Sequence, residues 1–383
     1  MDEYRKIQIS VPSVGEDELE AMRGSIETGW LTQGPRVREF EQEFAKKHDV
    51  KYAIATTSCT TALHLMLAAA EIGPGDEVIV PSFTWIATAN AVLYCGATPI
   101  LCDVDPITYN IDIQDAVRRI TPKTRAIIAV HLFGLCVDIP DLQSRIPRNI
   151  LIFEDAACAA GAHINGVPAG TLGHAAAFSF HPRKSITTGE GGMLTTNDPE
   201  LASKAEQMRN HGAAVSEEER HHGSKPYLLP EFNLLGFNYR MTDLQGSVGL
   251  VQLRKLETFV DERDKWAKYY VRELEDLPWL LMPSIPQNGG HAWQSFVTRV
   301  DEGKSPAKRN SIMALLQDRG ISTRPGTHAI HMLGYYVNRF GYRPLDFPHA
   351  KLCNDTTMAL PLHNKMQEAD YEYVVSAIRR ITE

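Results

Sequence analysis

The sequence predicts an α/β protein with a mainly parallel central sheet, helices on both faces of that sheet, and a smaller C-terminal α+β domain. Short apolar runs that are typical of buried strands alternate with helical segments, and they occur at residues 51–56, 77–80, 98–104, 125–131 and 149–155. Strands that alternate with helices form parallel sheets, because each helix carries the chain back to the same edge. The length of 383 residues also exceeds what one small core can organise.

The rest of the chain extends this pattern and suggests where it divides. Further strands are predicted at residues 175–180, 193–196, 293–300 and 321–324, and further helices at 306–319 and 368–381. A long helix is predicted from residue 242 to about 277, between the two groups of strands. We therefore expect a large domain over residues 1–250 and a small C-terminal α+β domain over residues 251–383.

The composition is ordinary for a globular protein, with 43% hydrophobic and 22% charged residues. The formal net charge of -8 argues against non-specific nucleic-acid binding, which needs a basic face. No apolar run approaches the roughly 20 residues that span a bilayer, and the first residues lack an apolar signal region. Six cysteines without a C-x-x-C pair predict a reduced, cytoplasmic protein without structural zinc. The paired His221 and His222 lack a metal-ligand spacing, so no metal is expected.

A lysine follows the predicted strand at residues 175–180. Lys184 lies in a polar turn at the exit of that strand, before a stretch rich in hydroxyls and glycine at residues 185–192. Partial burial at such a place lowers the pKa of a lysine and frees its amine to attack carbonyl groups. The alternative is a solvated surface lysine beside a turn, which is the more common situation for lysine.

A carboxylate ends another predicted strand. Asp155 closes the run at residues 149–155, and ligands of α/β sheets bind at the carboxyl ends of strands. A lysine and an acid at neighbouring strand ends are what pyridoxal phosphate (PLP) requires. The lysine forms a Schiff base with it, and the carboxylate keeps its ring nitrogen protonated. The alternative for Asp155 is a helix N-cap before residues 156–160.

Hydroxyl side chains gather at the turn after the first predicted strand. Residues 57–61 read Thr-Ser-Cys-Thr-Thr, and a predicted helix continues over residues 62–70. The free backbone N–H groups at the start of a helix bind anions such as phosphate. Plain capping of the helix by Ser58 or Thr60 is the alternative.

Three motifs occur in one order along the chain: EDAACA at residues 154–159, SFHPRKSITTGEGG at 179–192 and GFNYRMTDLQ at 236–245. Together they resemble the DegT/DnrJ/EryC1/StrS family of sugar aminotransferases, which are fold-type I PLP enzymes. The similarity runs from WLTQGPRVREFE at residues 30–41 to the histidine segment near His331. Three motifs in the same order are far more specific than any one of them.

The resemblance implies roles around the cofactor ring. Lys184 and Asp155 would be the catalytic residues, and Trp85 would stack on the pyridine ring. A core tryptophan under the following helix is the alternative for Trp85. Cys158 would be a further cofactor contact near the ring hydroxyl, although many relatives carry Gln or His there and this chain departs from the family pattern.

The resemblance also implies how the cofactor phosphate is held. Cys59 and Thr60 would bind it at the turn, although this chain has Ser-Cys-Thr where the usual pattern resembles Asn-Gly-Thr. Ser179 would be a further cofactor contact. Asn238 would reach the phosphate of the neighbouring subunit, which implies a homodimer with shared active sites. A helix-start turn with only local bonds is the alternative for Asn238.

The expected reaction is transfer of an amino group from an amino acid, with glutamate as the expected donor, to a nucleotide-linked keto-deoxy sugar. The substrate-binding residues that we expect are Thr32, His181, Arg324, His328 and His331. Dehydratase relatives carry His at the lysine position, so Lys184 favours transamination. A non-catalytic binding protein that keeps the fold is a second alternative. A nicotinamide oxidoreductase is disfavoured, because no G-x-G-x-x-G follows the first strand.

Overall fold

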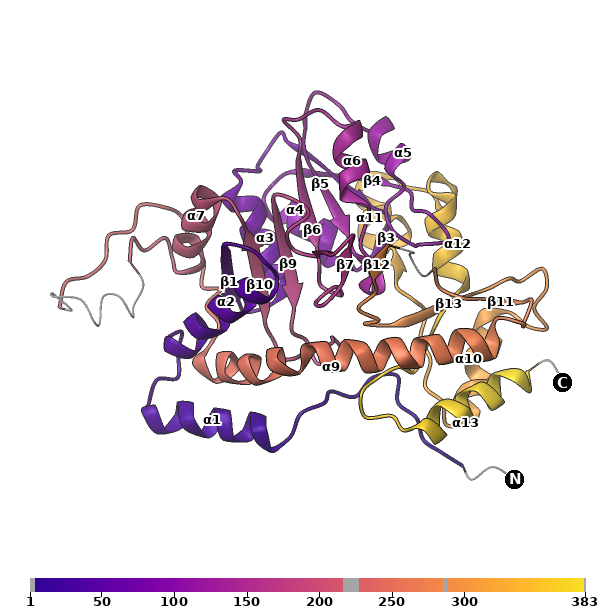
Figure 1. Ribbon diagram of the computed structural model, residues 1–383. Coiled ribbons are helices and arrows are strands. Elements are labelled where there is room, and N and C mark those ends of the chain that lie inside the picture. Colours follow the sequence, from indigo (N-terminus) through magenta and orange to yellow (C-terminus); the bar gives the residue numbers. More distant parts are fainter. Residues whose placement is uncertain (1–3, 216–226, 285–287, 382–383) are drawn as a thin grey trace.

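The computed structural model describes residues 4–215, 227–284 and 288–381 (Figure 1). A seven-stranded sheet lies at its centre, in the order β1-β10-β9-β6-β5-β2-β4. Its strands are β1 (Tyr52–Thr56), β2 (Glu77–Pro81), β4 (Thr98–Cys102), β5 (Thr124–Val130), β6 (Leu151–Asp155), β9 (Ala175–Ser179) and β10 (Gly192–Thr196). Strand β10 is antiparallel to both of its neighbours, and the other four pairs are parallel. This mostly parallel sheet confirms the predicted fold class.

Helices cover both faces of the sheet. On one face lie α3 (Cys59–Ala69), α4 (Ala87–Tyr94) and α7 (Pro199–Arg209), and their apolar side chains pack with Ala175, Ala177 and Leu194. The other face carries α2 (Pro35–Lys47), α5 (Ile113–Arg118), α6 (Ile139–Arg145) and α9 (Asp243–Leu274). Alternate residues of β9 face opposite sides, as the two-residue period of a strand requires. Helix α1 (Glu16–Thr28) packs along α9.

Helix α9 joins the sheet to the C-terminal elements. Figure 1 shows it running beneath the sheet and reaching α10 (Arg309–Asp318) and α13 (Glu368–Arg379). Its second half packs in a separate core with the antiparallel sheet of β11 (Leu280–Leu281), β13 (Phe296–Val300) and β15 (Thr357–Leu360). Because one continuous helix serves both cores, the division at residue 250 falls inside α9 and stays a prediction.

The predicted strand at residues 321–324 is wrong. Ile321 makes an isolated bridge to Ile7, and Arg324 makes another to Ala359. The N-terminal segment supplies the partner, with the Ile7 N–H 2.9 Å from the Gly320 carbonyl oxygen and Arg5 paired with Asp370 at 2.8 Å. The partner of Ile321 is more than 300 residues away in the sequence, so no local pattern could predict this bridge.

Short elements complete the fold, and one pair of them connects the C-terminal region to the large domain. Strand β3 (Phe83–Thr84) pairs with β14 (His328–Ala329) in a separate two-stranded sheet, which joins a segment of the C-terminal region to the residues just after β2. The others are β7 (His163–Ile164), β8 (Val167–Pro168), β12 (Gly289–Gly290), α11 (Gly334–Phe340), α12 (Pro348–Thr356) and the 3₁₀ turns Leu132–Gly134, Ile330–Met332 and Pro344–Asp346.

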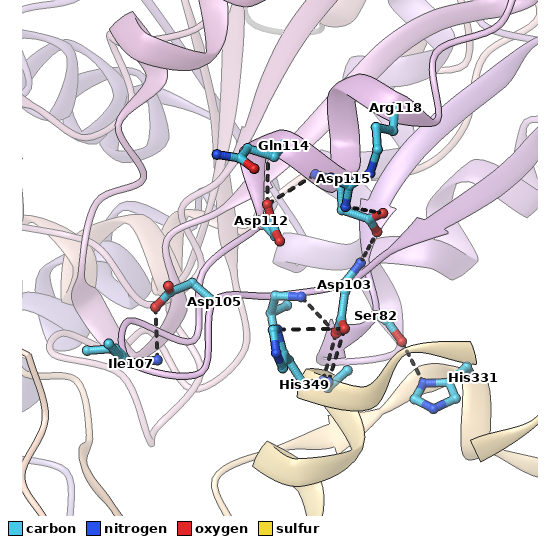
Figure 2. Close-up of polar contacts among 12 residues, drawn as sticks. Ser82, Asp103, Asp105, Ile107, Asp112, Gln114, Asp115, Arg118, His331 and His349 are labelled. Carbon is cyan, nitrogen blue, oxygen red and sulfur yellow. Dashed lines mark hydrogen bonds and ion pairs between the residues drawn. The ribbon is translucent and has the colours of Figure 1, made fainter. Parts of the chain in front are cut away.

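Asp103 connects the end of β4 to helix α12 (Figure 2). Its buried carboxylate accepts hydrogen bonds from the N–H groups of His349 at 3.0 Å and Ala350 at 2.7 Å, in the first turn of α12. A carboxylate there satisfies free N–H groups and favours the positive end of the helix dipole. Ser82 makes a parallel link, with its hydroxyl 2.6 Å from Nδ1 of His331. These contacts fix the segment that carries His328 to the carboxyl edge of the sheet.

Replacing Asp103 by alanine should lower the free energy of unfolding by about 1.5–3 kcal/mol, because the N–H groups of His349 and Ala350 lose a charged acceptor and that of Ala350 is buried. Urea unfolding of the full chain measures this change. Asp141→Ala is the matched control, since that carboxylate makes a surface pair with Arg145 at 2.8 Å, worth roughly 0.3–0.5 kcal/mol. Equal losses in the two variants would contradict the docking role of Asp103.

Candidate active site

The loop after β9 holds Lys184 in place. The Lys184 N–H donates to the carbonyl of His181 at 2.8 Å, and the Thr188 N–H donates to the carbonyl of Phe180 at 3.0 Å. The side chain of Lys184 is partly buried, and its Nζ lies 3.1 Å from Sγ of Cys158. The surface-lysine alternative therefore does not describe this residue. Its amine points into the protein at the strand exit.

Asp155 lies at the end of β6, which is the neighbour of β9. The register pairs Asp155 with Ala177, two residues before the end of β9. Asp155 is 5% exposed, and its carboxylate accepts hydrogen bonds from the Thr88 hydroxyl at 2.7 Å and the Ala157 N–H at 3.2 Å. Burial raises the pKa of this carboxyl, and these two hydrogen bonds oppose the rise. Residues 156–162 form turns, so the N-cap alternative is wrong.

Sequence reasoning missed Thr88. This residue lies in α4 and orients the Asp155 carboxylate, while its own hydroxyl lies 3.2 Å from that of Thr84. The sequence signal that could have identified Thr88 is the pair of threonines, Thr84 and Thr88, on either side of Trp85. The repeat has helical spacing, but only the folded chain shows that the acid it meets is Asp155.

The expected lowering of the Lys184 pKa is wrong for the chain without its cofactor. Burial lowers the pKa of Lys184, but Cys158, Cys59 and Asp155 together raise it by a larger amount, so the pKa lies above its ordinary value. A buried ammonium is stabilised when groups that carry or can carry negative charge surround it. Sequence reasoning predicted the position of Lys184 correctly, but it did not predict that Cys59 and Cys158 would lie beside the amine.

The turn after β1 combines capping with free N–H groups. Ser58 is the N-cap of α3, because its hydroxyl accepts from the Thr61 N–H at 3.2 Å, so the capping alternative is confirmed for Ser58 and not for Thr60. The N–H groups of Cys59 and Thr60 lie in the first helical turn, which has no intrahelical acceptors for them. The turn runs against β10 at Gly192, where a Cβ atom would lie 2.4 Å from the Ser58 carbonyl carbon. Glycine therefore permits this close approach.

Comparisons with known proteins agree with this geometry. The family model described as the DegT/DnrJ/EryC1/StrS aminotransferase family matches residues 12–379. The chain belongs to this family. It is 38% identical over 384 residues to GDP-perosamine synthase of Caulobacter vibrioides, with 100% of each chain covered. The structure of an aminotransferase from Psychrobacter cryohalolentis has a TM-score of 0.92 and 30% identity, with 98% of each chain covered. The PLP form of Spr1654 from Streptococcus pneumoniae has a TM-score of 0.91 and 26% identity, with 99% of each chain covered.

The chain is thus a PLP-dependent aminotransferase, and the residues present fit that cofactor. Lys184 and Asp155 lie at adjacent strand ends, and the start of α3 offers N–H groups to a phosphate. The Ser185 hydroxyl is buried beside Lys184 and has no hydrogen-bond partner among the described residues. An unsatisfied buried hydroxyl is costly unless a ligand completes it. Ser185 is therefore a second residue that the sequence reasoning missed.

Two further side chains expected to contact the cofactor are those of Trp85 and Ser179, and these contacts stay predictions. Trp85 is 60% exposed, so the core alternative is wrong, and stacking on the ring stays a prediction. The centre of its indole ring lies 5.7 Å from the centre of the imidazole ring of the exposed His328. The Ser179 hydroxyl is buried at the end of β9, where it accepts from the His181 N–H at 3.4 Å.

The residues expected to bind substrate do not all face one space. Thr32 and Arg324 are exposed and His181 is partly buried, so these three stay predictions. His331 is fully buried and both of its ring nitrogens are engaged, with the Ser82 hydroxyl at 2.6 Å and the Pro344 carbonyl at 3.1 Å. The expected substrate contact of His331 is therefore not supported. Its role in this structure is to hold two segments together.

Two sets of acidic or histidine side chains do not extend the site. Glu154 faces the opposite side of β6 from Asp155, where it pairs with the buried His131 at 2.8 Å. His221 and His222 lie outside the described residues. Among residues 4–215, 227–284 and 288–381, no group of three His, Cys, Asp or Glu side chains could hold a metal ion. No helix in the same ranges is long and apolar enough to cross a membrane.

A cavity of about 340 Å³ lies between α2 and α7. Its lining includes Arg38, Glu41 and Arg209, and Glu41 forms an ion pair with Arg209 there. Neither Lys184, Asp155 nor Cys158 lines it. The reactive side chains therefore lie outside this cavity.

Proposed function

We propose that this aminotransferase moves an amino group from glutamate to a nucleotide-linked keto-deoxy sugar, in amino-sugar biosynthesis for a glycan, lipopolysaccharide or secondary metabolite. The contact of Lys184 with the Asp155–Cys158 turn carries the proposal, because it places an amine and a buried carboxylate at one end of the sheet. The similarity to GDP-perosamine synthase supports a sugar acceptor. The net charge of -8 gives no support to a nucleic-acid partner.

PLP, when bound, supplies the electron sink and carries the amino group between donor and acceptor. Lys184 would hold it and then, once its amine is free, move a proton to or from the reacting carbon as general base and acid. Asp155 would keep a proton on the ring nitrogen, with its carboxylate oriented by the Thr88 hydroxyl at 2.7 Å. The N–H groups of Cys59 and Thr60 would bind the phosphate.

The test of this function is an assay with the full chain, PLP, glutamate and a nucleotide-linked 4-keto-6-deoxyhexose. Mass spectrometry should detect an amino sugar and 2-oxoglutarate in equal amounts. Loss of oxygen from the sugar without gain of nitrogen would indicate a dehydratase. Failure to develop the absorbance of a Schiff base after addition of PLP would support a non-catalytic binding protein.

We further propose a homodimer in which the two chains share their active sites. Asn238 is exposed, and the segment before it exposes a run of apolar side chains, namely Tyr227, Leu228, Leu229, Phe232, Leu234 and Leu235. Exposed apolar patches of this kind mark protein interfaces. Asn238 is also close to its own phosphate turn, since the Thr57 N–H donates to the Tyr239 carbonyl at 3.0 Å. A same-chain role of Asn238 is therefore the alternative.

The free state of all six cysteines supports a reducing, cytoplasmic location.

Replacing Asn238 by alanine should weaken cofactor binding by about 1.5–3 kcal/mol, the value of one lost hydrogen bond to a charged group. Mixing this chain with a Lys184→Ala chain tests whether the sites are shared. A mixed dimer would then hold one site with both defects and one with neither. Activity should return at roughly the statistical fraction of mixed dimers.

Asn233→Ala is the matched control for the mixing experiment, because Asn233 is another exposed asparagine of the same segment. It should bind the cofactor as the unmodified chain does. If mixed dimers form and no activity returns, or if an active monomer sediments, the shared-site proposal is wrong.

A further inference from the structure

The amine of Lys184 and the thiol of Cys158 are in contact, with Nζ 3.1 Å from Sγ. The two side chains come from different parts of the chain. Cys158 lies in the turn after β6, and Lys184 lies in the loop after β9. Both residues are partly rather than fully buried, so each keeps some contact with solvent. The proton transfers assigned to Lys184 and Asp155 do not involve the sulfur.

The remaining groups around this pair leave Cys158 as its reactive sulfur. Cys59 is the other thiol nearby, but it is buried, with Sγ 3.6 Å from the Ala177 carbonyl oxygen. Burial and the charge of Asp155 raise the pKa of Cys59, which keeps it a neutral thiol. Cys158 instead has an ammonium in direct contact, and sulfurs beside a cation are the ones that peroxides oxidise.

We propose that Cys158 is an oxidation site at which a peroxide joins Sγ to Nζ of Lys184 through a reversible sulfur–nitrogen bond. In the first step Cys158 attacks hydrogen peroxide, so that sulfur is oxidised by two electrons to a sulfenic acid and peroxide is reduced to water. In the second step the neutral amine of Lys184 attacks that sulfur. The new S–N bond forms as hydroxide leaves, and the amine proton converts it to water.

The contact distance favours the second step over competing reactions. A sulfenic acid condenses with whichever thiol or nitrogen lies next to it. The nearest such group shown is Nζ of Lys184 at 3.1 Å. The raised pKa of Lys184 means that the neutral amine is scarce near neutral pH, so cross-linking should accelerate as pH rises. The bond is broken by two equivalents of a thiol, which restore Cys158 and Lys184 and leave a disulfide.

The consequence for the enzyme rests on the proposed role of Lys184. A cross-linked amine cannot hold PLP, so the chain without its cofactor would be locked inactive until a thiol reduces it. A bound cofactor occupies the same amine and would protect the pair. The site would therefore respond to peroxide only when the cofactor is absent.

The experiment uses the full chain in two portions, one loaded with PLP and one stripped of it. Both are treated with hydrogen peroxide, free thiols are blocked, and the digested peptides are mapped by mass spectrometry. The stripped portion should give one linked pair of peptides, joining Cys158 to Lys184 with the loss of two hydrogens. Dithiothreitol should release it and restore the uptake of PLP, measured by absorbance. The loaded portion should show no such link.

Cys95 provides the matched comparison, because Cys95 and Cys158 are the two cysteines that are not buried. Burial raises the pKa of Cys95 to about 12, and its sulfur donates to the His64 carbonyl oxygen at 4.0 Å. Cys95→Ser should leave the link unchanged, and Cys158→Ser should abolish it while uptake of PLP becomes insensitive to peroxide.

Several results would overturn the inference. A disulfide between Cys59 and Cys158, or oxygen added to Cys158 with Lys184 left free, would show that the sulfur takes another course. Equal oxidation of Cys95 and Cys158 would remove the selectivity. A link in a chain that never takes up PLP would support the modification site and contradict the assigned role of Lys184.

Discussion

Replacing Lys184 by alanine should abolish amino transfer. The side chain places its amine 3.1 Å from Cys158 in the turn after Asp155, and both halves of the reaction need it. It would hold the cofactor, and it would move the proton at the reacting carbon. Loss of a positioned proton carrier alone costs about 10²–10⁴-fold in rate, and loss of the covalent attachment adds to that. Turnover with glutamate and the keto-sugar measures the effect.

The matched control for this substitution is Lys204→Ala. Lys204 lies on the surface of α7 and pairs with Glu71 at 2.7 Å, so its removal should leave turnover unchanged. The Lys184→Ala chain should still bind PLP without the Schiff-base absorbance. Turnover near that of the unmodified chain would disprove the assignment, whereas a stable complex of cofactor and amino sugar in the variant would strengthen it.

The parts of the site that follow strand ends could be predicted from the sequence. Lys184 and Asp155 stand where an apolar run gives way to polar residues, and this pattern is local. Parallel strands then bring such ends to one edge of the sheet without further information. The same reasoning predicted a hydroxyl-rich turn at residues 57–61 before a helix, and the helix itself begins earlier than predicted, at Cys59.

Contacts between distant segments could not be predicted in this way. Thr88 reaches Asp155 from another element, 67 residues away in the sequence, and no pattern within α4 announces that. His331 is similar, because the Ser82 hydroxyl that occupies its Nδ1 lies 249 residues earlier. The direction of the Lys184 pKa also depended on Cys59 and Cys158, two neighbours that only the folded chain assembles.

Replacing Asp155 by asparagine should slow turnover more than it weakens cofactor binding. The amide nearly matches the shape of the carboxylate and can still accept a hydrogen bond, but it carries no charge to hold a proton on the ring nitrogen. Loss of one such electrostatic contact costs about 10²–10³-fold in rate. Single-turnover kinetics with glutamate measure the first half-reaction directly. An unchanged rate would mean that the Asp155 carboxylate has only a structural role.

The stability of the same variant separates the chemical role from a structural one. The pKa of Asp155 in the folded chain lies above its ordinary value of 3.8 because burial disfavours the charge. The unmodified chain therefore loses stability as pH rises from about that ordinary value through the raised pKa. The asparagine side chain of the Asp155→Asn variant does not titrate, so the cofactor-free variant should be at least as stable as the unmodified chain at neutral pH. The difference should shrink as pH falls through the raised pKa. Thermal unfolding across this range measures it, and a variant that is less stable at neutral pH would show that the charge itself supports the fold.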